Sequence, residues 1–174
     1  AIIFSRKEIA EKIDRAVFPG MQGGPHNNVT AAIAAMFGEA LKPSFKRYQH
    51  QIVKNAKVLA RELLRRGFKL ATGGTDNHML LADVRPFGLD GMAAQNILED
   101  VGIIANRNSI PGDPSPFRPS GLRMGTPSPA SRGMKEKEMA AIAEIMQAAL
   151  TRKRSPEKIR REVSRLCRRF PIYI

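Results

Sequence analysis

Four short apolar runs, set between longer helical patterns, constrain the fold of this 174-residue chain. Each run has the length and composition of a β-strand. They lie at 68–72 (FKLAT), 78–84 (HMLLADV), 101–106 (VGIIAN) and 121–125 (GLRMG). The segment MAAQNILEDV, between the second and third runs, has a helical pattern. Strands alternating with helices, followed by helices that cover one face, predict an α/β or an α+β two-layer sandwich.

The first part of the chain is predicted to be mostly helical. Residues 1–4 (AIIF) are expected to form a short strand, after which Ser5 and Glu8 have the spacing of a capping box. A helical pattern then runs from 28 to 67, with a bend expected near Pro43 and a C-terminal cap at Gly67. One face of this long helix carries an apolar stripe: Ile52, Ala56, Leu59, Leu63 and Leu64.

The last part of the chain is predicted to form two amphipathic helices, near 134–151 and 155–169. The first carries the apolar set Ile142, Ile145, Met146, Ala149 and Leu150. The second lies within a strongly basic segment, 151–169. This segment alone contributes +7 to a net charge of +13. Its own apolar stripe is Ile159, Val163, Leu166, Cys167 and Phe170.

The basic segment has more than one interpretation. Its charge suits a nucleic acid or an anionic membrane surface. Its apolar stripe favours instead a packed terminal helix with a solvated basic face. No aromatic residue is interleaved with the basic ones, as base stacking would require, so nucleic-acid binding is the less favoured interpretation.

Several site classes have little support in the sequence. The single Cys167 excludes an internal disulfide and is expected to be a small buried residue. His26, His50 and His78 lack partners at metal-ligand spacing, so no metal site is predicted. His78 opens an apolar run and is expected to be a strand-end histidine that is bonded locally. No run approaches the ~20 apolar residues of a membrane span. The first residues lack a signal peptide and an initiator methionine, and are expected to continue from a preceding segment.

Two segments do carry candidate chemistry. The glycine-rich FPGMQGGPHNN (18–28) precedes a helix, where backbone N–H groups and the helix dipole favour an anion; a plain tight turn fits the spacing equally well. SGLRMGTP (120–127) places Arg123 on a short strand after a polar loop. An arginine fork binds a carboxylate through two hydrogen bonds, although a surface arginine in a basic protein needs no ligand.

Taken together, the motifs resemble one enzyme family. AVFPGMQGGPH, GGTDNHMLLADV, ILEDVGIIANRNSIPGD, SPFRPSGLRMGTP and LCRRFPIY resemble serine hydroxymethyltransferase in order and spacing, over essentially the whole chain. This family uses pyridoxal 5'-phosphate to interconvert serine and glycine, and tetrahydrofolate carries the one-carbon unit. The resemblance implies the aspartate-aminotransferase-like fold type I. In that fold, 1–45 would be the end of the large cofactor domain with a linking helix, and 46–174 the small C-terminal domain.

The resemblance also implies roles for individual residues. Arg123 matches the arginine that grips the α-carboxylate of serine or glycine. Gly23 and Gly24 match a loop that reaches the cofactor phosphate of the neighbouring subunit. The folate site would include Asn108 and the run Ser115, Pro116 and Phe117. The family's cofactor lysine follows a histidine, and no lysine here does, so no catalytic residue is nominated.

The expected function is therefore part of a glycine hydroxymethyltransferase, with the isolated chain inactive. Self-association, or a chain that supplies the large domain, is the expected partner, and a cytoplasmic location is the default. The alternatives are a non-catalytic binding or regulatory module, which could associate with RNA, and one half of a split enzyme.

Overall fold

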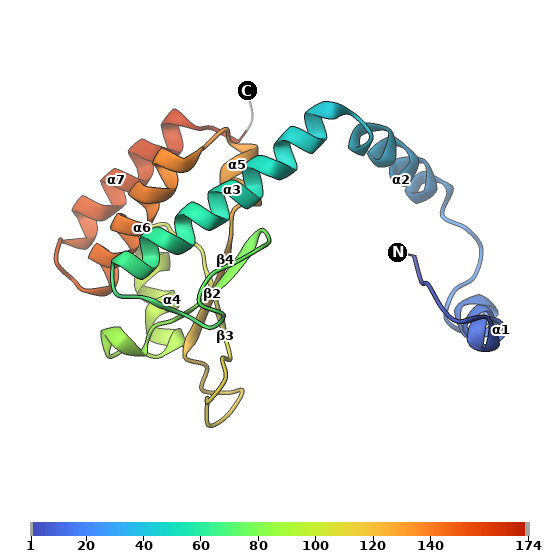
Figure 1. Ribbon diagram of the computed structural model, residues 1–174, viewed down its shortest axis with the longest axis horizontal. Coiled ribbons are helices and arrows are strands. Elements are labelled where there is room, and N and C mark those ends of the chain that lie inside the picture. Colours follow the sequence, from blue (N-terminus) through green and yellow to red (C-terminus); the bar gives the residue numbers. More distant parts are fainter. Residues whose placement is uncertain (1, 173–174) are drawn as a thin grey trace. The chain divides into compact units, whose positions relative to one another are not determined.

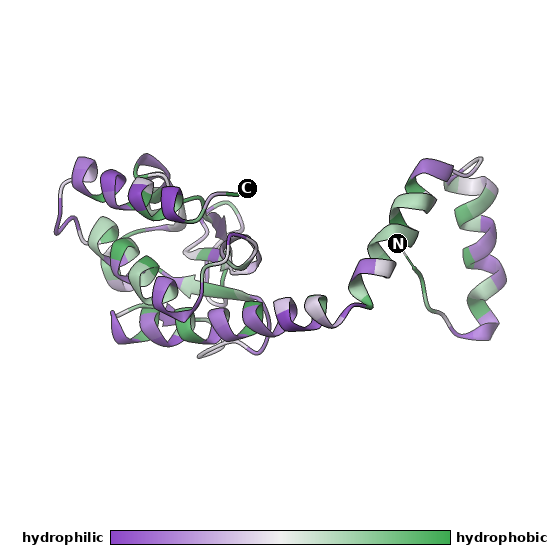
Figure 2. Cartoon of the chain, turned by 90° about the horizontal axis from the view of Figure 1, so that it is seen from above, coloured by the Kyte–Doolittle hydropathy of each residue, from purple (hydrophilic) through white to green (hydrophobic). Residues whose placement is uncertain are grey.

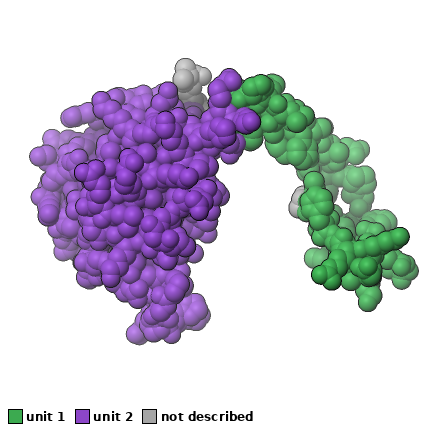
Figure 3. Space-filling model, viewed as in Figure 1, with its two compact units in different colours: residues 1–45 green, residues 46–174 purple. Residues whose placement is uncertain are grey.

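The computed structural model describes residues 2–172, which belong to two compact units. The units comprise Ala1–Phe45 and Lys46–Ile174 and are coloured separately in Figure 3. The assignment of the first unit to a large domain and of the second to a small domain stays a prediction.

The first unit consists of two α-helices joined by a π-helical turn and a glycine-rich loop. These elements are α1 (Lys7–Arg15), η1 (Ala16–Met21) and α2 (Asn27–Ala40). Neither α-helix contains a buried residue, and large apolar side chains such as Met36 and Phe37 are exposed.

Two predictions for this unit are wrong. Residues 2–4 are not a strand, because no other segment pairs with them in a backbone ladder; Ala1 lies outside the described residues. The residue that caps α1 is Arg6, not Ser5, and it makes no side-chain capping bond. The helix itself is present, because its sequence favours helix without the capping box.

The second unit is built on a four-stranded sheet of order β1-β2-β4-β3, in which every neighbouring pair is antiparallel. The strands are β1 (Lys69–Leu70), β2 (Met79–Asp83), β3 (Asn106–Asn108) and β4 (Gly121–Gly125). Helices α3 (Pro43–Arg65), α4 (Gly91–Asp100), α5 (Pro127–Ser131), α6 (Glu136–Leu150) and α7 (Pro156–Arg169) complete it, with a short 3-10 turn η2 (Arg85–Phe87).

One face of the sheet carries the core. Leu80, Ala82 and Leu122 are almost fully buried and form one cluster with apolar residues of α3, α4, α6 and α7. In Figure 1, α7 runs along α6, as their contacts also show. The mixed helix and sheet prediction is confirmed, in its α+β form with helices gathered on one face of an antiparallel sheet.

Most predicted elements of this unit are present. The long helix does break near Pro43, and Gly67 ends α3 with a positive φ of 89°. Four of the five predicted stripe residues of α3 are buried, but Leu64 is 42% exposed because it lies at the edge of the stripe. Most of the α7 stripe packs as expected: Ile159 is fully buried, and Val163, Leu166 and Phe170 pack against the core. Cys167, which was predicted to be buried, is only half-buried.

The third predicted strand is misplaced. Most of 101–106 is irregular, and β3 starts at Asn106. Part of this apolar run is nevertheless placed against the core: Val101 and Ala105 are buried after the end of α4, whereas Ile104 is 77% exposed. Burial of a loop therefore produced the apolar run that resembled a strand. The short helix α5 was not predicted.

The threonine of the SGLRMGTP motif ties the sheet to α3. Thr126 is fully buried, and its hydroxyl donates a 2.7 Å hydrogen bond to the carbonyl oxygen of Ile52. We predict that Thr126→Val, which keeps the shape and removes the donor, lowers the free energy of unfolding by about 1–2 kcal/mol. Urea denaturation tests this. Thr126→Ser keeps the hydroxyl and should lose less; an equal loss in both variants would contradict a role for the hydrogen bond.

Candidate functional site

Arg123 lies on the face of the sheet that the helices leave uncovered. In β4, the side chain of Leu122 enters the core, and alternation along the strand places Arg123 on the opposite face. There Arg123 is opposite Leu81 of β2 and Asn106 of β3. Arg123 is exposed, and its side chain has no hydrogen-bond or ion-pair partner among the described residues. Its guanidinium is therefore available to a ligand.

A hollow of about 830 Å³ surrounds this arginine. Its lining includes Asn108 at the end of β3 and the turn at 72–77 between β1 and β2. The register explains why the two predicted binding residues lie together, because Asn108 is opposite Gly121, two residues from Arg123 on the neighbouring strand. The structure thus brings the predicted carboxylate-binding residue and one predicted folate-binding residue to a single site.

The TDNH motif forms the rim of this hollow. The Thr75 hydroxyl donates to the carbonyl oxygen of Met79 at 2.5 Å, and the Asn77 side-chain oxygen accepts from the Met79 N–H at 2.8 Å. These bonds fix the turn that leads into β2. His78 follows as the residue before the strand, and its carbonyl oxygen accepts from the N–H of Thr126. The motif therefore has a local structural role that its sequence alone did not reveal.

A charged cluster fixes the loop between β3 and β4. The Arg85 side chain donates to both carboxylate oxygens of Asp83, at 2.8–3.2 Å. One carboxylate oxygen of Asp113 accepts from the backbone N–H of Ile110 and of Ser120, both at 2.9 Å, and so joins the two ends of the loop. The sequence analysis did not single out these residues; the Pro-Gly-Asp turn at 111–113 was the available signal.

Both carboxyl groups of this cluster are stabilised in their charged form. Hydrogen bonding from Arg85 lowers the pKa of Asp83, and hydrogen bonding from Ser120 and Ile110 lowers the pKa of Asp113. A carboxyl whose folded pKa is lowered stabilises the fold above its unfolded pKa, here near 3.8, and this contribution disappears as the pH falls through the lower folded value.

We therefore predict an acid-dependent role for Asp113. The difference in free energy of unfolding between the wild type and Asp113→Asn should be constant from pH 7 to pH 5 and shrink below about pH 4. Urea denaturation at several pH values measures it. A difference that stays the same down to pH 3, or that grows, would contradict the lowered pKa.

Other predicted site residues are not among those that line the hollow. Ser115, Pro116 and Phe117 are in the loop between β3 and β4 and do not line it, and the Phe117 side chain is 93% exposed. Gly23 and Gly24 belong to the other unit, in the loop before α2. Neither glycine has a positive φ, and a Cβ atom added to either would meet nothing within 4 Å.

The described residues do not by themselves form a pyridoxal phosphate site. No lysine follows a histidine anywhere in the chain, and the glycine loop is open where a cradle would hold a phosphate closely. Within residues 2–172, no three or more His, Cys, Asp or Glu side chains are grouped as metal ligands. None of the helices in the same range is both long enough and apolar enough to cross a bilayer.

A comparison with protein families identifies the family of the chain. The family model described as serine hydroxymethyltransferase matches residues 4–146, which is most of the chain. The match includes the glycine-rich loop, the TDNH turn, β3, β4 and the SGLRMGTP motif. The chain therefore belongs to the serine hydroxymethyltransferase family.

Proposed function

We propose that this chain contributes the carboxylate-binding part of a glycine hydroxymethyltransferase, which transfers the hydroxymethyl group of serine to tetrahydrofolate. The observation that carries the proposal is the unpaired, exposed Arg123 on the uncovered face of the sheet, within the SGLRMGTP motif of the family. The fold would be the small domain of a fold-type I enzyme, preceded by the end of the large domain.

Arg123 has the chemistry for this role. Its guanidinium presents paired N–H donors to the two oxygens of an amino-acid carboxylate. Because Arg123 is held on a central strand between β2 and β3, its backbone is fixed by ladders on both sides. A carboxylate held at two points leaves the substrate little rotational freedom, which orients the bonds at its α-carbon.

We propose that Asn108 and the loop at 109–120 bind the folate co-substrate. Asn108 lines the same hollow as Arg123, which supports its role. The Asp113 bonds hold the ends of the loop, which supports a fixed position for Ser115, Pro116 and Phe117.

The cofactor would be held together with another polypeptide, either a second copy of this chain or a chain with the cofactor lysine. The exposed apolar residues of α2 support such an association, because Val29, Ile33, Met36 and Phe37 form a surface that is normally covered. Gly23 and Gly24 would then offer backbone N–H groups to the cofactor phosphate across the interface.

We predict that the 174-residue chain alone does not catalyse the reaction. Pyridoxal phosphate, when bound, stabilises negative charge at the substrate α-carbon, and no lysine of the chain follows a histidine, as the lysine that anchors the cofactor does in the family. The purified chain, incubated with the cofactor and glycine in deuterated water, should show no exchange of the glycine α-hydrogen above a protein-free blank by NMR. Measurable exchange would contradict the prediction.

A further inference from the structure

The basic surface of α7 has no role in the proposed reaction. The family match ends at residue 146, before α7 begins at Pro156. Segment 151–169 contains nine lysines and arginines and two glutamates, and Figure 2 shows α7 with mostly hydrophilic colouring. Several of these cations have structural partners, and Arg169 lies over the Phe170 ring at 5.5 Å. Arg154 donates to Glu162 at 2.7 Å, and Arg160 donates to the carbonyl oxygen of Asp100.

Three other arginines form an unpaired stripe. Arg161, Arg165 and Arg168 are exposed and lie four and three residues apart, so they share one face of the helix. The side chains of Arg165 and Arg168 make no hydrogen bond or ion pair with another described residue, and the Arg161 side chain donates only a 3.4 Å hydrogen bond to the carbonyl oxygen of Glu157. With Arg169 they line a surface depression of about 430 Å³ that contains no carboxylate.

The opposite side of α7 is already occupied by the core. Ile159 is 1% exposed, and Val163 and Leu166 pack against the core cluster. An amphipathic helix that lies in a membrane interface must bury its apolar face among the lipid chains. This face is not free, so the helix can offer only its charged side to a partner, which argues against a membrane.

We propose that the Arg161, Arg165 and Arg168 stripe binds the phosphate backbone of a nucleic-acid duplex without reading its sequence. The stripe extends for about 10 Å along the helix axis. This length corresponds to about three successive phosphate spacings along one strand of a duplex. Guanidinium groups bind phosphate oxygens as two-point donors. Among residues 2–172, the aromatic residue that follows α7, Phe170, packs against the core and offers no free ring for base stacking, so a duplex fits better than a single strand.

The test measures binding of the full chain to a fluorescent DNA duplex of about 20 base pairs by anisotropy, across a series of salt concentrations. In the triple variant Arg161→Gln, Arg165→Gln and Arg168→Gln, affinity at about 0.1 M salt should fall at least tenfold. The plot of log K against log salt should become shallower by about 2.7, which corresponds to three lost phosphate contacts.

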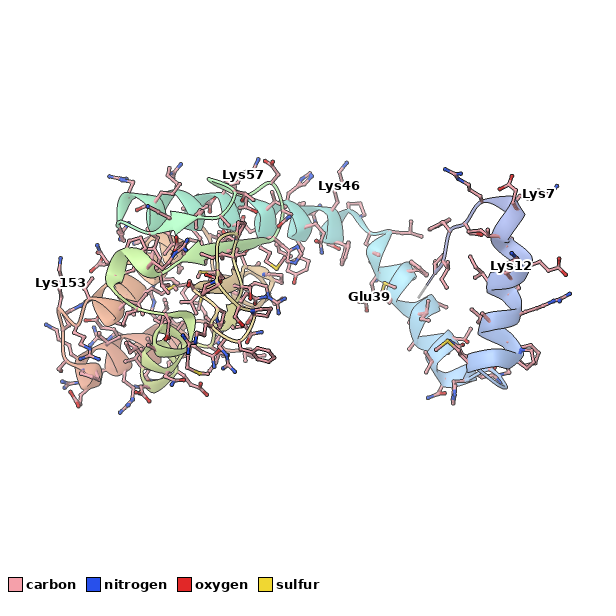
Figure 4. The ribbon with its side chains drawn as sticks, turned by 90° about the horizontal axis from the view of Figure 1, so that it is seen from below. Lys7, Lys12, Glu39, Lys46, Lys57 and Lys153 are labelled. Carbon is pink, nitrogen blue, oxygen red and sulfur yellow. The ribbon has the colours of Figure 1, made fainter. Side chains whose placement is uncertain are left out.

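A matched control removes the same charge elsewhere. Lys7, Lys12 and Lys57 are labelled in Figure 4 and lie on α1 and α3; all three are exposed, and their joint change to Gln should alter the slope by less than about 1. Conversion of the three α7 arginines to Lys should preserve the slope, because the point charges remain. Thermal unfolding verifies that each variant is folded.

Four results would overturn the proposal. They are no duplex binding at about 50 mM salt, equal losses in the stripe and control variants, equal or tighter binding of a single strand, and binding of phosphatidylserine vesicles without binding of the duplex.

Discussion

Changing Gly121 to alanine is expected to lower the free energy of unfolding by about 3 kcal/mol. A Cβ atom at this position would lie 2.5 Å from Ile110 Cγ2, 2.6 Å from the carbonyl oxygen of Asn108 and 3.1 Å from Leu81 Cδ1. The Asn108 oxygen is backbone in the neighbouring strand and cannot move without disturbing the ladder between β3 and β4. The loss should appear in urea denaturation as a lower midpoint with an unchanged slope.

A second glycine serves as the control. Gly74 has neither a positive φ nor an atom within 4 Å of an added Cβ, so Gly74→Ala should change the stability by less than about 0.5 kcal/mol. Similar stabilities for Gly121→Ala and the wild type would mean that Asn108 and Ile110 do not approach β4 as closely as described.

Changing Arg123 to lysine is expected to lower serine cleavage about 100-fold in an assembly that also supplies the cofactor lysine. Lysine keeps the charge but loses the fork that holds both carboxylate oxygens. Steady-state kinetics with serine should show the loss, while the visible absorbance of the bound cofactor stays as in the wild type.

Arg107 provides the matched control for this change. It lies opposite Leu122 on the adjacent strand, so it belongs to the other face of the sheet and does not line the hollow. Arg107→Lys should leave serine cleavage within about twofold of the wild type. Equal losses in the two variants would argue against a specific role for Arg123.

The sequence was sufficient to predict the elements in which apolar residues recur at a regular spacing. The stripe from Ile52 to Leu63 and the stripe on α7 predicted their helices because burial on one face imposes the helical spacing. The run at 121–125 coincides with β4. The run at 101–106 failed because a loop packed on the core is as apolar as a strand, and pairing depends on a distant partner.

The site could be predicted only in part, for a similar reason. The motif predicted a strand that carries Arg123, and the register of β3 places Asn108 in the lining of the same hollow; the binding roles of both residues stay predictions. The bonds that Asp113 makes to Ile110 and Ser120 depend on where the loop closes, which spacing does not give. The need for a glycine at position 121 likewise depends on tertiary structure, because atoms from two other segments lie too close to leave room for a Cβ atom.

The most direct test of the account is a crystal structure of the chain, in its cofactor-bearing assembly, with glycine bound. The account predicts that both glycine carboxylate oxygens lie about 2.7–2.9 Å from guanidinium nitrogens of Arg123. A glycine carboxylate bound by other residues, with Arg123 still directed to solvent, would contradict it.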